Sequence, residues 1–434
     1  MQIHIFTSRL TPRLQYVGRF ILEQQMGLLV KWVLQPPDHL SEAWINYTHA
    51  SYANAFNITP HSLLFETGIR QQNIAFCNKD SLKAFFPCAS AADFPFDIFA
   101  ATFYLLSRYE EYLSPEQDQH GRFPATASIA YQQKFLDEPI VHHWIQAFQY
   151  ALRSKFPFLK FRSPVSCFIP TYDVDMAFAY RGKPLFRQIG AAVRDMLRRR
   201  FSEITLRWRV LTSQTKDPYD VYEWLNCIHE FHHLQPIYFF PVGKYGRYDK
   251  QIAPTQALYR QLIVSTASSF TTGIHLSYAS FLNEKKIKHE IGVFASVTGF
   301  QPQHNRFHYL RFRMPDSYRQ LLSAGIMHDY SMGYSTHAGF RAGVADAFFW
   351  YDLMAEQETA LQIHSFCWMD TSVVQTQSLP DTYAEQIWMM WEKIRAVGGI
   401  CMLVLHPNYF SEYGRFRGYR QAYQHVVQQI MQHQ

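Results

Sequence analysis

The chain has 434 residues, the length of about two domains of ordinary size. Hydrophobic residues make up 48% of it and charged residues 18%, which excludes a disordered or low-complexity protein. The net charge of +6 is too small over this length to indicate nucleic-acid binding by charge alone. We therefore expect a globular protein with no nucleic-acid partner.

Neither the apolar runs nor the cysteines indicate a membrane-spanning or secreted protein. The longest apolar runs, 28–34 and 400–405, have strand length and fall well short of the ~20 residues of a spanning helix. Residues 1–10 carry His4 and Arg9 and lack the apolar core of a secretion signal. The six cysteines form no CxxC pair, so we expect buried free thiols and a cytoplasmic location.

Residues 1–160 predict a smaller mixed α/β domain. Within 96–113, Ile98, Ala101 and Leu105 recur at helical spacing, which predicts one helix over this range. A second helix is predicted over 142–152. Short strand-like runs surround both helices.

From about residue 163, strand-like runs alternate with helical segments. Strands are predicted over 165–171, 236–242, 272–276, 309–312, 326–330, 361–366 and 400–406. Helices are predicted over 219–233, 281–298, 317–324, 347–357 and 380–397. This alternation is typical of a parallel sheet, either open or closed into a (β/α) barrel, and it predicts a second domain over 163–434.

Polar side chains gather just after the predicted strands, at the edge where parallel sheets build their sites. They are Asp173, Asp175, His275, His308, Asp329, Asp370 and His406. Carboxylates two residues apart could hold a divalent metal or divide the roles of base and ligand. Taken singly, each residue has a plainer explanation, a solvated turn for the aspartates or a structural histidine. Their recurrence at successive strand ends favours a site, and Arg341, between two glycines, is well placed to approach an anionic group or a carboxylate partner.

A competing motif lies at 229–233, where H-E-F-H-H satisfies the HExxH pattern of zinc metallopeptidases. At 100° per residue, His229 and His233 fall to the side of the apolar face of the predicted helix, and Glu230 falls opposite that face. The helix ends almost at once at Pro236. We interpret the motif as a polar helix face.

The order of the motifs resembles the polysaccharide deacetylase family, also called the NodB-homology or carbohydrate esterase 4 family. The similar segments are T-Y-D-V-D at 171–175, P-I-Y-F-F-P-V-G at 236–243, G-I-H at 273–275, the T-G turn at 298–299 before Arg306, and L-V-L-H at 403–406. The resemblance covers about residues 163–410 and is closest to a Bacteroidetes-type branch. That branch carries an uncharacterised, DUF7033-like N-terminal domain, which residues 1–160 resemble.

The resemblance implies an irregular (β/α) barrel that removes an N- or O-acetyl group from a sugar with the help of a divalent metal such as zinc. The implied metal ligands are Asp175, His275 and His308. The family's usual second histidine ligand falls on Ala279 here, so His308 or a water must supply it.

The remaining site residues follow from the same comparison. The implied catalytic residues are Asp173 as base, His406 as acid, Arg306 as the group that orients the base, and Arg341. The residues predicted to contact substrate are Tyr278, Asp329, Tyr330 and Asp370.

An insertion at 181–214 carries a basic, amphipathic pattern of its own. Its arginines include Arg194, Arg198, Arg199, Arg200, Arg207 and Arg209, and its apolar residues lie at near-helical spacing. Such a helix is typical of a contact with an anionic membrane surface or anionic substrate groups. The alternative is a helix packed on the barrel with solvated arginines.

We therefore expect a metal-dependent hydrolase that removes acetyl groups from a carbohydrate, lipid-linked or free, during cell-surface glycan assembly. The alternative is a catalytically lapsed relative that keeps the carbohydrate groove and works as a binding protein. The metallopeptidase is a third and more distant interpretation.

Overall fold

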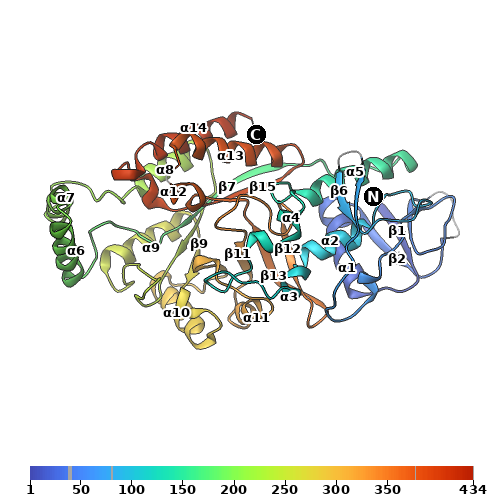
Figure 1. Cartoon of the computed structure of the whole chain (residues 1–434), viewed down its shortest axis with the longest axis horizontal. Helices are drawn as coiled ribbons and strands as arrows, with labels where there is room; N and C mark the ends of the chain where they lie inside the picture. The colour runs from blue at the N-terminus through green and yellow to red at the C-terminus, as the bar shows by residue number, and fades with distance from the viewer. Residues whose placement is uncertain (38–41, 80–81, 377, 434) are drawn as a thin grey trace.

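The computed structural model describes residues 1–37, 42–79, 82–376 and 378–433. Within these residues the strands form a four-stranded sheet, a nine-stranded sheet and a two-stranded hairpin (Figure 1). The first sheet and the hairpin belong to the N-terminal region. The large sheet holds all the strands that follow residue 163.

The N-terminal region is a small mixed α/β unit around a parallel sheet with strand order β2-β1-β3-β4. The strands are β1 Gln2–Thr7, β2 Leu29–Val33, β3 Trp44–Tyr47 and β4 Phe56–Asn57, with the hairpin β5 Phe76–Lys79 and β6 Leu82–Phe85. The helices are α1 Pro12–Gly18, α2 Ile98–Leu106, α3 Tyr109–Leu113, α4 Ile129–Gln132 and α5 Ile140–Lys155. Asp97 caps the start of α2 by accepting a hydrogen bond from the Ala100 N–H.

The nine-stranded sheet has the order β12-β13-β11-β10-β9-β8-β7-β15-β14. Its strands are β7 Ser166–Asp173, β8 Ile237–Phe240, β9 Thr271–Leu276, β10 His304–Phe307, β11 His328–Met332, β12 Ala347–Asp352, β13 Gln357–Ser365, β14 Trp368–Met369 and β15 Gly399–Leu405. All neighbours are parallel except β12, which runs antiparallel to β13.

One continuous segment turns this sheet into an irregular barrel. Strand β13 pairs with β11, and β14, only two residues further along the chain, pairs with β15. Between them, Phe366 N–H donates to the Met332 carbonyl and Cys367 N–H to the Met402 carbonyl. The segment 357–369 therefore bridges the two sides of the sheet, and the predicted α/β class with an irregular (β/α) barrel is confirmed.

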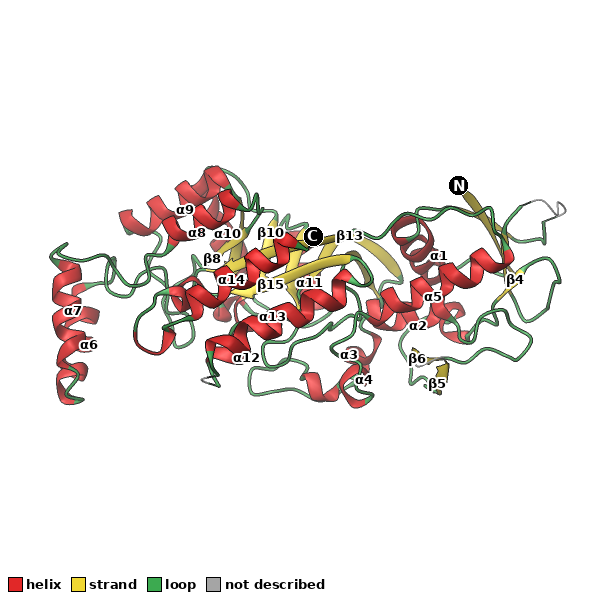
Figure 2. Cartoon of the chain, turned by 90° about the horizontal axis from the view of Figure 1, so that it is seen from above, coloured by secondary structure: helices red, strands yellow, loops and turns green. Residues whose placement is uncertain are grey.

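Helices cover the outside of the barrel, as Figure 2 shows for those around β15 and β8. They are α8 Tyr222–Phe231, α9 Ala257–Ser269, α10 Glu284–Thr298, α11 Asp316–Ser323, α12 Thr371–Val374, α13 Pro380–Arg395 and α14 Tyr419–Gln432. The barrel interior has its own apolar core, which includes Phe239, Tyr330, Phe366 and Val404. The outer core is continuous from Ile3 to Ile430, so the domain division near residue 160 stays a prediction.

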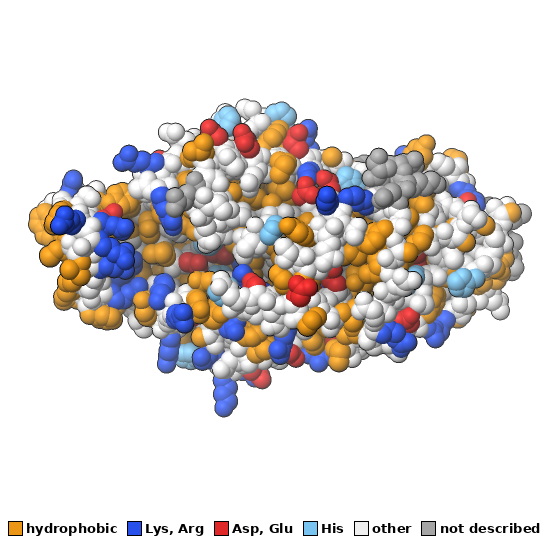
Figure 3. All heavy atoms as spheres, viewed as in Figure 1, with side chains coloured by type: hydrophobic (Ala, Val, Ile, Leu, Met, Phe, Trp, Pro, Cys, Tyr) orange, Lys and Arg blue, Asp and Glu red, His pale blue; other side chains and the backbone are white. Residues whose placement is uncertain are grey.

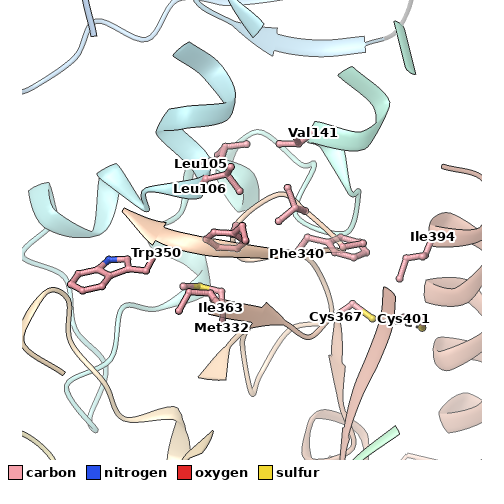
Figure 4. Close-up of a cluster of buried hydrophobic side chains, with 14 of the residues drawn as sticks. Leu105, Leu106, Val141, Met332, Phe340, Trp350, Ile363, Cys367, Ile394 and Cys401 are labelled. Carbon is pink, nitrogen blue, oxygen red and sulfur yellow. Dashed lines mark hydrogen bonds between the residues drawn. The ribbon is translucent and has the colours of Figure 1, made fainter. Parts of the chain in front are cut away.

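The N-terminal helices pack directly on the barrel through this outer core. Figure 4 shows Leu105 and Leu106 of α2 and Val141 of α5 facing the strands that carry Trp350 and Ile363. Two ion pairs reinforce the contact: a partly buried one joins Arg13 to Glu356, and a buried one joins Glu111 to Arg341. The N-terminal region is therefore fixed against the barrel rather than tethered to it.

Three expected elements differ from the structure. The helix predicted over 96–113 is two helices, because Arg108 adopts a left-handed conformation with φ 54° between them. The strand expected at 309–312 lies earlier, at His304–Phe307, because the positive φ angles of Tyr309 and Leu310 cannot continue a strand. The helix expected at 347–357 is strand β12, whose run of aromatic residues pairs with β13.

The insertion after β7 is a helical hairpin, α6 Leu185–Leu197 and α7 Phe201–Leu211, that projects from one end of the molecule (Figure 1). Arg207 is not a surface residue, as its guanidinium bonds Asp195 at 2.7 Å and so joins the two helices. Among the described residues, none of the helices combines the length and the apolar character that crossing a bilayer requires.

Candidate metal centre

Three side chains predicted as metal ligands converge at the carboxyl ends of neighbouring strands. Asp175 follows β7, His275 lies near the end of β9 and His308 follows β10. One ligand atom from each lies within 4.8 Å of the other two. Nε2 of His275 is 3.3 Å from one oxygen of Asp175, and Nε2 of His308 is 3.3 Å from the other.

Each histidine is oriented by a bond at its other nitrogen. Nδ1 of His275 lies 2.8 Å from the carbonyl oxygen of Arg306, and Nδ1 of His308 lies 2.8 Å from the carboxylate of Asp249. An acceptor at Nδ1 keeps the proton there and leaves Nε2 free, which is how histidine ligands of metals are usually held. Both imidazoles are therefore set to present Nε2 toward Asp175.

The electrostatics of the cluster also fit a cation. Burial lowers the pKa of His308, but the carboxylates of Asp175 and Asp249 outweigh it and raise that pKa to about 10. Burial raises the pKa of Asp175, yet the two histidines hold it well below its usual range. Asp175 Oδ1 is buried without a hydrogen-bond partner among the described residues. A divalent ion would satisfy this oxygen and replace the Nε2 proton of His308, since metals bind neutral imidazole.

A second carboxylate, Asp173, lies beside the three ligands at the end of β7. Arg306, fully buried inside the barrel, donates from one guanidinium nitrogen to Asp173 Oδ1 at 2.8 Å and from another to Thr171 at 2.8 Å. The free oxygen Oδ2 is 3.8 Å from Nε2 of His275. The arginine thus fixes the carboxylate with one oxygen directed at the cluster.

His406 lies on the opposite side of the cluster, at the end of β15. Its Nε2 is 3.6 Å from Asp175 Oδ2, and its Nδ1 is 2.7 Å from the buried carboxylate of Asp370. Burial lowers the pKa of His406, but Asp370 and the other carboxylates raise it to about 9. The carboxylate of Asp370 thus favours the protonated imidazole.

The three candidate ligands, Asp173 and His406 meet at one cavity of about 440 Å³. This volume lies within the range of about 300–1,000 Å³ that is typical of small-molecule sites. Asp173, Asp175, His275, His308 and His406 line it. In Figure 3, acidic side chains are recessed in a hollow of this face.

None of the four residues predicted to contact substrate lines this cavity. Asp329 and Asp370 are fully buried and bond Asn305 and His406, respectively, which makes them supports of the barrel and of the imidazole. Tyr330 is buried in the barrel core, and its hydroxyl is 3.1 Å from His304. Tyr278 packs against residues of the cavity wall, with its ring 4.2 Å from that of Tyr248.

Arg341 was expected among the catalytic residues, and the structure places it elsewhere. Its guanidinium is buried and makes two bonds to the carboxylate of Glu111, at 2.6 and 2.8 Å. The glycines beside it allow close packing, as a Cβ on Gly339 would lie 2.4 Å from the Leu136 carbonyl oxygen. Arg341 thus joins the N-terminal region to the barrel.

The HExxH motif does not form a metal site. His229 is buried, not on a polar face as expected, and its Nε2 is 2.8 Å from the Tyr172 hydroxyl. Glu230 and His233 are exposed, and His233 lies beyond the end of α8 with φ 53°. Among the described residues, the group able to hold a metal ion is Asp175, His275 and His308.

Sequence reasoning missed Asp249, which orients His308, and the segment 114–124, which reaches the cavity from the N-terminal region. Gln119, His120 and Arg122 of this segment line the cavity. Asp249 lies in a loop that follows a predicted strand, a position that could have drawn attention. The segment 114–124 carries no local signal, because it meets the cavity only through tertiary packing.

Residues 3–157 match a sequence family described as a family of unknown function (DUF7033). No curated protein matches the chain.

Solved structures similar to the chain include three proteins with related descriptions. A polysaccharide deacetylase from Mycobacterium smegmatis is 14% identical, with a TM-score of 0.41, over 62% of this chain and 85% of that one. A CE4 family pseudoenzyme from Bacillus anthracis is 7% identical, with a TM-score of 0.29, over 63% and 66%. A de-N-acetylase from Aggregatibacter actinomycetemcomitans is 11% identical, with a TM-score of 0.22, over 39% and 89%. With TM-scores below 0.5, these similarities support no assignment of activity.

Proposed function

We propose that the chain is a metal-dependent hydrolase that removes an acetyl group from a carbohydrate used in cell-surface glycan assembly. The observation that carries this proposal is the convergence of Asp175, His275 and His308 beside Asp173 and His406 in one cavity. The sequence motifs that resemble those of polysaccharide deacetylases supply Asp173, Asp175, His275 and His406, and His308 stands in for the family's second histidine ligand. One carboxylate and two imidazoles form a donor set that suits zinc and leaves a coordination position open.

The chemistry divides among the residues of the cavity. A divalent ion at Asp175, His275 and His308 would polarise the acetyl carbonyl and lower the pKa of a bound water. Asp173, held by Arg306, accepts a proton from the attacking water at its free oxygen. His406, protonated and held by Asp370, donates its Nε2 proton to the departing sugar nitrogen or oxygen. Acetate and a free amine or hydroxyl result.

The proposal is tested by acetate release from a panel of N- and O-acetylated sugars and oligosaccharides. The protein is stripped with a chelator and assayed before and after the addition of zinc. We expect release only with the metal, and unchanged release from the Glu230→Gln variant, which alters the HExxH motif alone. Zinc binding without release from any substrate would favour the carbohydrate-binding alternative, and loss of activity in Glu230→Gln would favour the metallopeptidase.

We place the protein, as part of this proposal, at the cytoplasmic surface of the inner membrane, with the hairpin α6–α7 as its contact. Apolar side chains that are normally buried are exposed along the hairpin: Leu185, Phe186, Ile189, Val193, Met196, Leu197, Phe201, Trp208 and Leu211. Exposed arginines lie among them at 194, 198, 199, 200 and 209. Figure 3 shows orange and blue side chains together at this end of the molecule.

This combination matches an anionic lipid surface, where apolar side chains enter the interface and each basic residue adds about 1 kcal/mol. A lipid-linked carbohydrate would then be presented beside the cavity. We expect cosedimentation with anionic vesicles that weakens as salt rises, and loss of it in Phe186→Ser/Leu197→Ser. The matched control is Phe231→Ser, which removes an equally exposed side chain outside the hairpin. Equal recovery of the hairpin variant and the control would contradict the contact.

A further inference from the structure

The turn that carries His308 is an irregular part of the candidate metal centre. His275 lies within strand β9, whereas His308 comes after the end of β10 at Phe307. The next two residues, Tyr309 and Leu310, both have left-handed backbones, with φ angles of 60° and 52°. Residues other than glycine hold such angles where the surrounding structure enforces them. The position of His308 therefore depends on the contacts that hold this turn.

One of these contacts comes from the N-terminal region. The guanidinium of Arg122 donates a hydrogen bond to the carbonyl oxygen of Tyr309, the residue after His308, at 2.6 Å. The same nitrogen donates to the Ser335 hydroxyl oxygen at 3.2 Å. A charged donor gives a stronger hydrogen bond than a neutral one. Arg122 thus bonds the turn directly to a segment that lies 187 residues earlier in the chain.

Arg122 is itself held in place by a compact turn over residues 118–122. The carboxylate of Asp118 accepts hydrogen bonds from Nε of Arg122 at 2.7 Å and from the N–H groups of His120 and Arg122 at 2.8 and 3.0 Å. The Asp118 N–H donates to the Arg122 carbonyl oxygen at 2.9 Å, and Gly121 supplies the left-handed conformation, φ 74°, that this reversal needs. The side chain of Arg122 therefore reaches the barrel in a fixed orientation.

The barrel makes a second connection to the same N-terminal turn. Arg311, just after the turn of His308, donates from Nε to the carbonyl oxygen of His120 at 2.9 Å. The ring of His120 lies 5.7 Å from that of Tyr278. The N–H of Tyr278 in turn donates to the oxygen of Asp249 that faces Nδ1 of His308. The N-terminal turn thus contacts both the backbone beside His308 and a residue that bonds its supporting carboxylate.

We infer that the N-terminal region is a positioning element of the metal centre, and that Arg122 is the positioning residue that acts on His308 through the turn. A ligand whose support is removed must be ordered when the ion binds, which weakens the binding. The inference rests on the proposed metal centre. It gives residues 3–157, which match a family of unknown function, a role in holding one of the three ligands.

Calorimetric titration of zinc into the chelator-stripped protein tests the inference in Arg122→Met. Methionine removes the donor to the Tyr309 carbonyl, so we expect the zinc affinity to fall on the order of tenfold. Arg122→Lys keeps a cationic donor and should recover part of this loss. Asp118→Asn is a milder second variant, because it weakens the hold on Arg122 and leaves the arginine in place, and it should lower the affinity by a smaller factor.

The matched control is Arg19→Met, which also removes an ion pair between the N-terminal region and the barrel. Arg19 pairs with Glu358 of β13, so its loss should leave zinc binding like that of the wild type. A second readout is the visible absorption spectrum of the cobalt-loaded protein, which depends on the number and geometry of the ligands. This spectrum should change in Arg122→Met, where His308 is loosened, and stay like that of the wild type in Arg19→Met.

An unchanged zinc affinity and cobalt spectrum in Arg122→Met would overturn the inference and leave the metal centre standing. Equal losses in Arg122→Met and Arg19→Met would also overturn it, because they would reflect a general loosening of the N-terminal region. The proposed function fails separately: a wild-type protein that binds no zinc would remove the metal centre and the inference with it.

Discussion

At the scale of single residues, the site depends on pairs in which one side chain holds another. Arg306 fixes Asp173, Asp249 fixes His308 and Asp370 fixes His406. The convergence of Asp173, Asp175, His275, His308 and His406 on one cavity could be predicted from the sequence, because each follows or ends a predicted strand or lies in a motif. The supports were harder to predict: Asp249 went unnoticed, and Asp370 was expected at the substrate, because spacing along the chain does not show which side chain another will meet.

Asp173→Asn tests the assignment of the base. Asparagine keeps an oxygen for Arg306 but cannot take a proton, so acetate release should fall on the order of 10²–10⁴-fold. Zinc affinity should stay close to that of the wild type, since Asp173 is outside the proposed ligand set. Initial rates and a zinc titration on the same preparation check both points, and unchanged turnover would show that another group is the base.

Arg341→Met tests the structural role that replaces the expected catalytic one. Removing one partner of a buried ion pair leaves Glu111 uncompensated and should cost about 3–5 kcal/mol in the free energy of unfolding. Glu111→Leu/Arg341→Met should recover part of this loss. Denaturant unfolding measures both variants. A fully stable single variant with no activity would instead return Arg341 to the reaction.

At the scale of elements, the alternation of strands and helices predicts the barrel. The wrong predictions concern the type or the ends of single elements, which depend on pairing and backbone conformation. Strands β7, β8, β9 and β15 lie where apolar runs in the sequence predict strands. The sequence predicts a helix where strand β12 lies, because the aromatic run 348–351 fits either element and only its pairing with β13 makes it a strand. Arg108, Tyr309 and Leu310 have left-handed backbones that end a helix or a strand. None of them is a glycine, so the sequence does not mark these ends.

Leu105→Ala tests how firmly α2 is packed against the barrel. The side chain is 1% exposed and belongs to the continuous core of Figure 4, so its truncation should cost about 2–5 kcal/mol in the free energy of unfolding. Leu197→Ala on α6, where the leucine is 81% exposed, is the matched control and should change stability by less than about 0.5 kcal/mol. Denaturant unfolding measures the free energy of unfolding of both variants. Equal losses in the two variants would contradict the packing of α2 against the barrel.

At the scale of the whole molecule, two features lie outside what any single motif could predict. The cavity of the metal centre takes part of its wall from Gln119, His120 and Arg122 and the rest from the barrel, so it spans both predicted domains. The basic, apolar hairpin lies at the end of the molecule away from the N-terminal region (Figure 1). The basic insertion could be recognised in the sequence, but the folding of its two helices into a projecting hairpin, joined through Arg207 and Asp195, could not.

The central claim is that Asp175, His275 and His308 hold one divalent ion. Calorimetric titration of zinc into chelator-stripped protein tests it most directly, with His275→Ala and Asp175→Asn as site variants and His229→Gln, in the HExxH motif, as the matched histidine control. The account predicts about one tightly bound zinc per chain in the wild type and in His229→Gln, and loss of that binding in both site variants. No bound zinc in the wild type, or unchanged binding in His275→Ala and Asp175→Asn, would contradict it.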